Sequence, residues 1–149
     1  MTSTSTADPT TGTGGGRPEL RLTMTAAIHA RFAHRVDGLV HSHPWSIEAT
    51  VEGPADAAKV MPADDLEQLL HDLVEPWRGH YLTDVDLGHW KGYEPLVWDT
   101  EPTVEEIARR LWDRLVADVP GLVSIGVVES TEFDRSRTVR FTRCETDKH

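Results

Sequence analysis

Three histidines in the first third of the chain have the types and spacing of a metal site. His41 and His43 are two residues apart, and alternate residues of a β-strand point to the same face of a sheet. His34 lies two residues after Phe32, on the apolar side of the preceding segment. If the two segments pair through a short turn, the three imidazoles converge on one point.

Three imidazoles without an acid among them suit Zn²⁺, which binds neutral nitrogen ligands and can leave a fourth position open for water or substrate. An open position indicates a metal that takes part in chemistry rather than a structural metal. Imidazole also binds other transition metals, so zinc is the preferred ion and not the only one. The alternative is a chance His-x-His pair near the start of a strand.

The strands that must position these histidines are visible as alternation of apolar and polar residues. Residues 20–32 alternate almost strictly, residues 36–38 have the composition of a turn, and residues 45–51 alternate again. A period of two over these lengths predicts two half-buried strands that are joined as a hairpin.

Two helices follow in the sequence pattern. Apolar residues recur every three or four positions in residues 66–77 and again in residues 107–115. Thr103 and Glu106 have the spacing of a capping box, which predicts that the second helix begins at Thr103. The intervening residues 78–101 are predicted to be irregular.

Two more strands, at residues 123–127 and 138–141, complete the order β-β-α-α-β-β. This order predicts an α+β domain with a four-stranded antiparallel sheet and both helices on one face. The ordered domain is expected over residues 18–142. Polar tails are expected at residues 1–17 and 143–149, because neither segment has apolar side chains to bury.

Composition narrows the classes of function. The 149 residues include 15 Lys and Arg against 25 Asp and Glu, a net charge of -10. Such an acidic chain is not expected to bind nucleic acid, and no apolar run approaches the ~20 residues of a membrane span. No secretory signal is visible, and the single cysteine, Cys144, cannot form an internal disulfide. A cytoplasmic protein is expected.

Five short segments, in order, form a more specific pattern. They are Phe32-Ala33-His34-Arg35, His41-Ser42-His43, His80-Tyr81-Leu82-Thr83-Asp84, Glu101-Pro102-Thr103-Val104-Glu105-Glu106-Ile107-Ala108 and Val127-Val128-Glu129. Together they resemble the 6-pyruvoyl-tetrahydropterin synthase and 6-carboxytetrahydropterin synthase family over about residues 20–142. The resemblance implies a T-fold (tunnelling fold), whose subunits form homo-oligomeric trimers, commonly stacked as hexamers, with active sites between subunits.

The same resemblance implies roles for individual residues. The zinc ligands would be His34, His41 and His43. Glu129 would anchor the pterin ring, since a carboxylate can accept two parallel N–H bonds, and its alternation with Val127 places it on the inner face. Thr103 and Glu105 would form a second patch near the pterin. The alternatives are a solvent-exposed acid at a strand end for Glu129 and a helix cap for Thr103.

The family's proton shuttle is not kept. Asp37 occupies the position of a cysteine four residues before the His-x-His pair, and Arg78 and Gly79 occupy the positions of an Asp-His pair. His80 follows directly. Asp37 and His80 are therefore the candidate catalytic acid and base, and the alternatives are a turn residue and a loop histidine.

The function that the resemblance implies is a zinc-dependent lyase of the 6-carboxytetrahydropterin synthase type. Its small-molecule substrate would be 7,8-dihydroneopterin triphosphate, on the way to deazapurines such as queuosine precursors. Because the shuttle positions differ, two alternatives stay open. One is a divergent paralogue that catalyses another cyclase or lyase step on a different small molecule, and the other is a non-catalytic assembly that binds a metal or a pterin.

Overall fold

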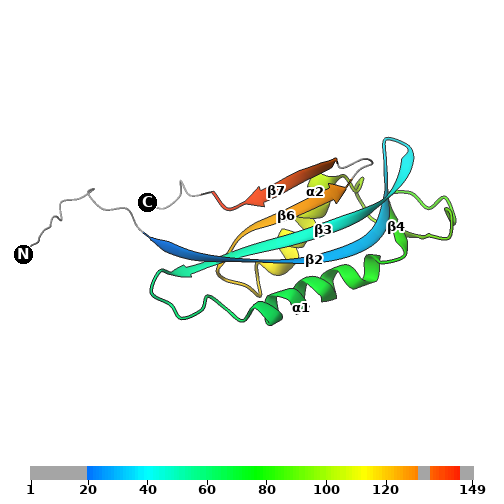
Figure 1. Ribbon diagram of the computed structural model, residues 1–149. Helices are drawn as coiled ribbons and strands as arrows, with labels where there is room; N and C mark the ends of the chain where they lie inside the picture. Colours follow the sequence, from blue (N-terminus) through cyan, green and yellow to red (C-terminus); the bar gives the residue numbers. More distant parts are fainter. Residues whose placement is uncertain (1–19, 131–134, 145–149) are drawn as a thin grey trace, which may run out of the picture.

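The computed structural model describes residues 20–130 and 135–144. In chain order the elements are β2 (Arg21–Val36), β3 (Leu39–Pro54), α1 (Ala63–Val74), the 3-10 helix η1 (Glu75–Trp77), β4 (His80–Thr83), β5 (Glu94–Val97), α2 (Val104–Leu115), β6 (Leu122–Ser130) and β7 (Ser136–Thr142). Figure 1 shows long strands covered by the two helices. The predicted tail 1–17 and most of the predicted tail 143–149 lie outside the described residues.

The sheet has six strands in the order β5-β4-β2-β3-β6-β7, so the prediction of an α+β fold is confirmed and the prediction of four strands is wrong. The two additional strands, β4 and β5, pair in parallel and extend the sheet beyond β2. Each has only four residues, and β5 contains Pro95. Segments this short are below the length at which alternation can be recognised, which is why residues 78–101 were expected to be irregular.

A two-residue turn fixes the register of the β2–β3 hairpin. Asp37 and Gly38 both have positive φ, 54° and 82°, which is the backbone of a type I′ turn. The turn makes His34 the direct partner of His41, and Phe32 the partner of His43. The predicted turn is confirmed, and its geometry places the three histidines at one end of the hairpin.

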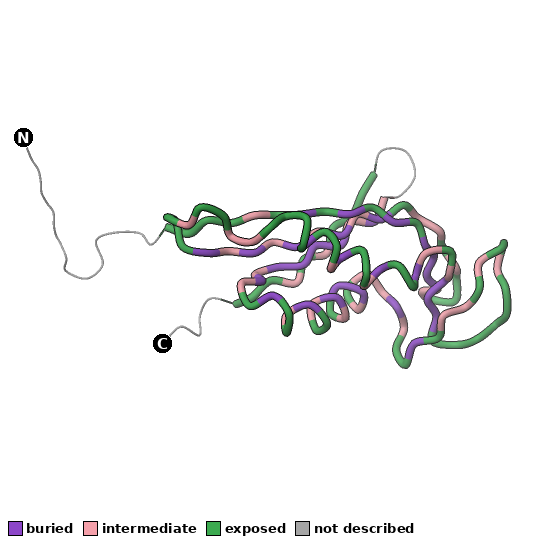
Figure 2. Tube along the Cα trace, turned by 90° about the horizontal axis from the view of Figure 1, so that it is seen from below, coloured by how far each residue is buried: buried purple, intermediate pink, exposed green. Residues whose placement is uncertain are grey.

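The core lies between the sheet and the helices. Alternate residues of β2 and β3 are buried against one side of α1 and α2, and Figure 2 shows these buried positions along the strands and helices. In α1 the buried side chains are Leu66, Leu70 and Val74, which are four residues apart and so share one face. No helix among the described residues is long and apolar enough to cross a membrane.

Four aromatic rings form a column through this core. Phe32 stacks on Trp45 with ring centroids 4.7 Å apart and meets the edge of Trp77 at 5.5 Å. Trp77 in turn meets Trp98 at 5.6 Å. This aromatic column (Trp45, Phe32, Trp77 and Trp98) connects the histidine end of the sheet to the space between the helices.

Candidate metal centre

Two histidines and a glutamate converge on the face of the sheet that carries the core. The Nε2 atom of His43 is 2.9 Å from Oε2 of Glu129, and Nε2 of His34 is 3.3 Å from the same oxygen. Glu129 reaches this point because it lies on β6 directly opposite Trp45 of β3. Trp45 is two residues after His43 and so shares its face of the strand. The three potential ligand atoms lie within 4.8 Å of one another.

Backbone carbonyls fix the orientation of both imidazole rings. His34 Nδ1 is 2.8 Å from the carbonyl oxygen of Pro102, and His43 Nδ1 is 3.2 Å from that of Ser130. A carbonyl oxygen only accepts, so each Nδ1 carries the proton and donates it. In a neutral ring, Nε2 is then left with a lone pair that faces the centre of the cluster. Hydrogen bonds of this kind commonly orient metal-bound histidines.

The electrostatics of the cluster favour a cation at its centre. Burial is the largest cause that lowers the pKa of His34 and of His43 below the ordinary value of 6.5, although Glu129 acts in the opposite direction on both. Both rings are therefore neutral near pH 7. Their Nε2 lone pairs then face a carboxylate oxygen, and three acceptors without a proton or a cation between them repel one another. A bound metal ion removes this repulsion, and two imidazoles with one carboxylate are a known zinc donor set.

His41 lies at the rim of the cluster. It is exposed, and its ring centroid is 6.1 Å from that of His34 and 5.8 Å from that of His43. The structure thus brings the three predicted ligands together at one end of the hairpin, but the closest group of ligand atoms includes Glu129 in place of His41. The sequence placed Glu129 on the inner face without indicating its contact with the histidines.

Trp45 supports both buried histidines and was missed as a site residue. The rings of His34 and His43 meet the Trp45 ring edge-on, with centroid distances of 5.0 and 5.5 Å. Trp45 is itself held by a hydrogen bond from Nε1 to the Phe32 carbonyl oxygen, 3.0 Å long. The signal in the sequence was an aromatic residue two positions after the His-x-His pair, on the same face of the strand.

The segment from Glu101 to Thr103 holds three neighbouring structures in place. Glu101 Oε2 accepts the backbone N–H of Asp37 over 2.8 Å, and the Pro102 carbonyl accepts from His34, as described above. Thr103 Oγ1 accepts the backbone N–H of Glu106 over 3.1 Å, so the predicted cap at the beginning of α2 is confirmed. One short segment therefore fixes the hairpin turn, a histidine ring and the start of α2.

Neither Asp37 nor His80, the predicted catalytic pair, belongs to the closest ligand group. Asp37 is exposed in the hairpin turn, where its positive φ is a conformation that Asp tolerates better than most residues. His80 is half-buried in β4, and its Nδ1 is 3.0 Å from the carbonyl oxygen of Arg78. Their catalytic roles, and the substrate-binding role of the exposed Glu105, stay predictions.

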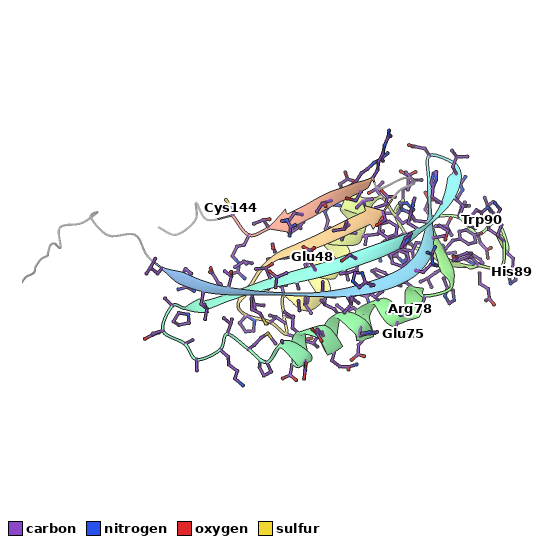
Figure 3. The ribbon with its side chains drawn as sticks, viewed as in Figure 1. Glu48, Glu75, Arg78, His89, Trp90 and Cys144 are labelled. Atoms are coloured by element: carbon purple, nitrogen blue, oxygen red, sulfur yellow. The ribbon has the colours of Figure 1, made fainter. Side chains whose placement is uncertain are left out.

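Arg78 stands where the family resemblance expects an aspartate, and it has structural contacts of its own. Its Nε is 3.0 Å from Oε1 of Glu75, beside it at the end of α1 in Figure 3, and its Nη2 donates to the His29 carbonyl oxygen over 3.1 Å. The Arg78 guanidinium is held by Glu75 and by the His29 carbonyl oxygen of β2, so it cannot act as the acid or base of an Asp-His pair.

We expect Thr103→Ala to lower the free energy of unfolding by about 1 kcal/mol, because it removes the side-chain cap of α2. Thr103→Ser keeps the hydroxyl and is the matched control, with a much smaller loss. Urea unfolding of both variants measures the difference. Equal stability of Thr103→Ala and the unchanged protein would mean that the cap contributes nothing and that the hydroxyl has another role.

The fold and site define an α+β protein with a buried cluster of two histidines and a glutamate at one end of a long hairpin. The sequence matches the family model of 6-pyruvoyl tetrahydropterin synthase over residues 22–140. The chain therefore belongs to the 6-pyruvoyl tetrahydropterin synthase family. A search of the curated proteins found no match.

Solved structures agree with this fold at low sequence identity. The 6-pyruvoyl tetrahydropterin synthase of Caenorhabditis elegans is 15% identical with a TM-score of 0.61, over 85% of this chain and 98% of that chain. The Plasmodium vivax enzyme, in a variant with a catalytic glutamate replaced by alanine, is 12% identical with a TM-score of 0.59, over 84% and 100%. An uncharacterized protein from Wolinella succinogenes is 14% identical with a TM-score of 0.66, over 83% and 98%.

Proposed function

We propose that this chain is a zinc-dependent lyase of the 6-carboxytetrahydropterin synthase type, acting on 7,8-dihydroneopterin triphosphate. The observation that carries the proposal is the convergence of the His34 and His43 Nε2 atoms on the Glu129 carboxylate, in a member of the 6-pyruvoyl tetrahydropterin synthase family. His41 at the rim would complete the set of imidazole ligands.

In this proposal the protein's own residues bind the substrate and move its protons. A bound zinc ion supplies Lewis acidity toward a side-chain oxygen of the substrate, which makes the neighbouring C–H bond more acidic. Glu129 orients the pterin ring through the carboxylate oxygen that faces away from His43. The buried Trp45 forms an apolar floor beneath both histidines and excludes water from that side.

Asp37 is the proposed base. In the Plasmodium vivax relative a glutamate is a catalytic residue, so a carboxylate is compatible with catalysis in this family. The hydrogen bond from the Asp37 backbone N–H to Glu101 holds the turn at the rim of the histidine cluster. His80 is a second candidate acid or base, although its ring is turned toward the Arg78 carbonyl.

Asp37→Asn is expected to lower kcat by about 100-fold, the lower end of what loss of a general base costs. Asn adopts positive φ as readily as Asp, so the turn and the metal site are retained. Asp113→Asn, which removes an exposed carboxylate from α2, is the matched control. A kcat that is equal in the two variants would exclude Asp37 as the base.

The second candidate function is a different lyase or cyclase step on another small molecule. It is favoured by Arg78, whose ion pair with Glu75 occupies the place of a shuttle residue. Turnover of 7,8-dihydroneopterin triphosphate by the zinc-loaded protein, with products identified by mass spectrometry, separates the two. A carboxy- or pyruvoyl-tetrahydropterin that disappears on chelation supports the first function. Bound zinc without turnover supports the second function, a lyase or cyclase step on another small molecule, or a binding protein without catalysis.

A homo-oligomer, trimer or hexamer, is part of the proposal. Along the described part of β2, the strand β4 pairs only with Ala33 and His34, so residues 21–32 have an open edge on that side. The other end of the described sheet is β7. Open edges of long strands favour pairing with another copy of the chain. Light scattering after size-exclusion chromatography measures the state, and a monomer at micromolar concentration would contradict it.

A further inference from the structure

A small hollow lies between the two helices, at the opposite end of the aromatic column from the histidines. Its lining residues are Leu73, Trp77, Trp98, Arg110, Leu111 and Arg114. About 260 Å³ of non-atom space lies around these side chains, and this figure includes open solvent, so the hollow itself is shallow. The hollow shares no lining residue with the candidate metal centre, so its role is a separate question.

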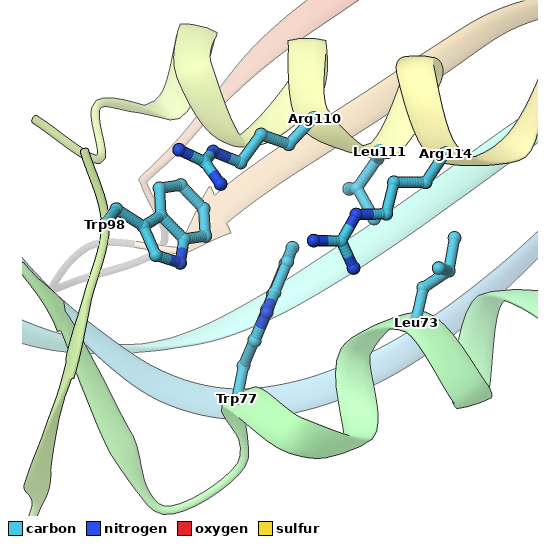
Figure 4. A pocket seen from close by; sticks show the side chains of 6 residues that line it. All are labelled: Leu73, Trp77, Trp98, Arg110, Leu111 and Arg114. Carbon is cyan, nitrogen blue, oxygen red and sulfur yellow. The ribbon is translucent and has the colours of Figure 1, made fainter. Parts of the chain in front are cut away.

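The side chains that line the hollow offer hydrogen-bond donors only. The polar groups are two guanidinium groups and two indole N–H groups, none of which can accept a hydrogen bond. Figure 4 shows the two arginines directed from α2 toward the two tryptophans, with no side-chain oxygen among the six. This donor-only lining occurs in a chain with 25 acidic and 15 basic residues. An acceptor-rich anion is the complementary ligand.

Arg110 is held in place by its neighbours. Its guanidinium lies over the Trp98 ring, 4.0 Å from the centroid, and Nη2 donates to Asp99 over 2.5 Å. Nε is 3.5 Å from Glu106 Oε2 and is buried without a hydrogen-bond partner among the described residues. The group is therefore pre-oriented at the wall of the hollow and still has donor capacity.

Arg114 lies one helical turn after Arg110 and so projects from the same face of α2. It is exposed, and it forms no hydrogen bond or ion pair with any other residue that the structure describes. Two guanidinium groups on one side of a helix, one fixed and one free, can hold an oxyanion between them with charge-assisted hydrogen bonds. Trp77 and Trp98 are nearly buried, and the parts of their rings that line the hollow adjoin whatever carries the anion.

We propose that this hollow is a binding site for a small aromatic oxyanion, a phosphate or carboxylate attached to a single ring. The anionic group lies between Arg110 and Arg114, and the ring packs against Trp77 in an offset or edge-to-face arrangement. The hollow is small and partly open to solvent, so a monocyclic ligand fits the site better than a larger one.

The test is calorimetric titration of the full, metal-loaded chain with phenyl phosphate at low salt. Arg114→Gln is expected to weaken binding at least about tenfold, because it removes one charged donor. Arg109→Gln is the matched control, since Arg109 lies on the same helix, pairs with Glu106 and does not line the hollow. Its affinity for phenyl phosphate is expected to equal that of the unchanged protein.

Four results would overturn the proposal. Absence of binding at millimolar phenyl phosphate would exclude the site. An equal loss of phenyl phosphate affinity in Arg114→Gln and Arg109→Gln would show a general effect of net charge. Unchanged affinity in both variants would place the anion elsewhere, for example at the metal. If inorganic phosphate binds as tightly as phenyl phosphate, the proposed contact between the ligand ring and Trp77 is wrong. The affinities of Trp77→Phe and Trp77→Ala for phenyl phosphate test this contact directly.

Discussion

Replacing His43 with alanine is expected to lower the affinity of the chain for zinc by at least about 100-fold and to abolish turnover with it. The reason is geometric, since His43 Nε2 makes the shortest contact of the cluster, 2.9 Å to Glu129. Even residues that only orient a metal ligand typically contribute 10–100-fold to affinity, so a ligand itself contributes at least as much. Zinc content after dialysis and competition with a chelator measure the change.

Two further variants make this prediction specific. His71→Ala removes an exposed histidine from α1 and controls for the number of imidazoles. His41→Ala separates two ligand sets, because loss of zinc would indicate three imidazoles, whereas retention would indicate His34, His43 and Glu129. Stoichiometric zinc in His43→Ala would contradict the metal centre altogether.

Glu129→Gln is expected to have the second-largest effect, because the carboxylate has two proposed roles. As a metal ligand it contributes the Oε2 atom that faces both histidines, and its loss should weaken zinc binding by about 10–100-fold. The folded state should survive, since an amide N–H can donate to the Nε2 lone pairs that the carboxylate only repels. Chelator competition and thermal unfolding measure these two quantities.

The pterin-anchoring role is measured separately, at saturating zinc. The charge-assisted hydrogen bonding between the free carboxylate oxygen and the ring is replaced by weaker hydrogen bonding, so pterin affinity is expected to fall at least about tenfold. Calorimetry with a non-reactive pterin on the zinc-loaded variant gives this value. Unchanged zinc affinity would remove Glu129 from the ligand set, and unchanged pterin affinity would remove it as the anchor. The loss of zinc affinity and the loss of pterin affinity both lower turnover, so turnover should fall by a larger factor than either affinity.

Local patterns in the sequence were sufficient for the hairpin and its histidines. Alternation along residues 20–32 and 45–51, with a two-residue turn between them, determines which side chains share a face. The capping box at Thr103 and Glu106 was equally local, and it predicted the start of α2 correctly. Each of these signals depends on residues that are close in the sequence.

The contacts that depend on distant segments could not be read in the same way. Glu129 meets His43 because β6 pairs with β3 in one particular register, which shifts between Thr50 and Val51. His34 is oriented by the Pro102 carbonyl, and a backbone oxygen leaves no trace in residue type. Arg114 has the sequence context of a solvated charge on a helix, and only the fold brings it to the same hollow as Trp77.

The two-residue turn at Asp37 and Gly38 also limits how this hairpin can change through evolution. An inserted residue in β3 between the turn and His41 would shift both His41 and His43 to the opposite face, away from His34 and Glu129, where the turn keeps its pairing. Substitutions in the turn that keep positive φ leave the site intact, whereas a single insertion or deletion in β3 before His41 destroys it. Related chains that keep the site should therefore differ here in sequence and not in length, or should differ in length by two residues.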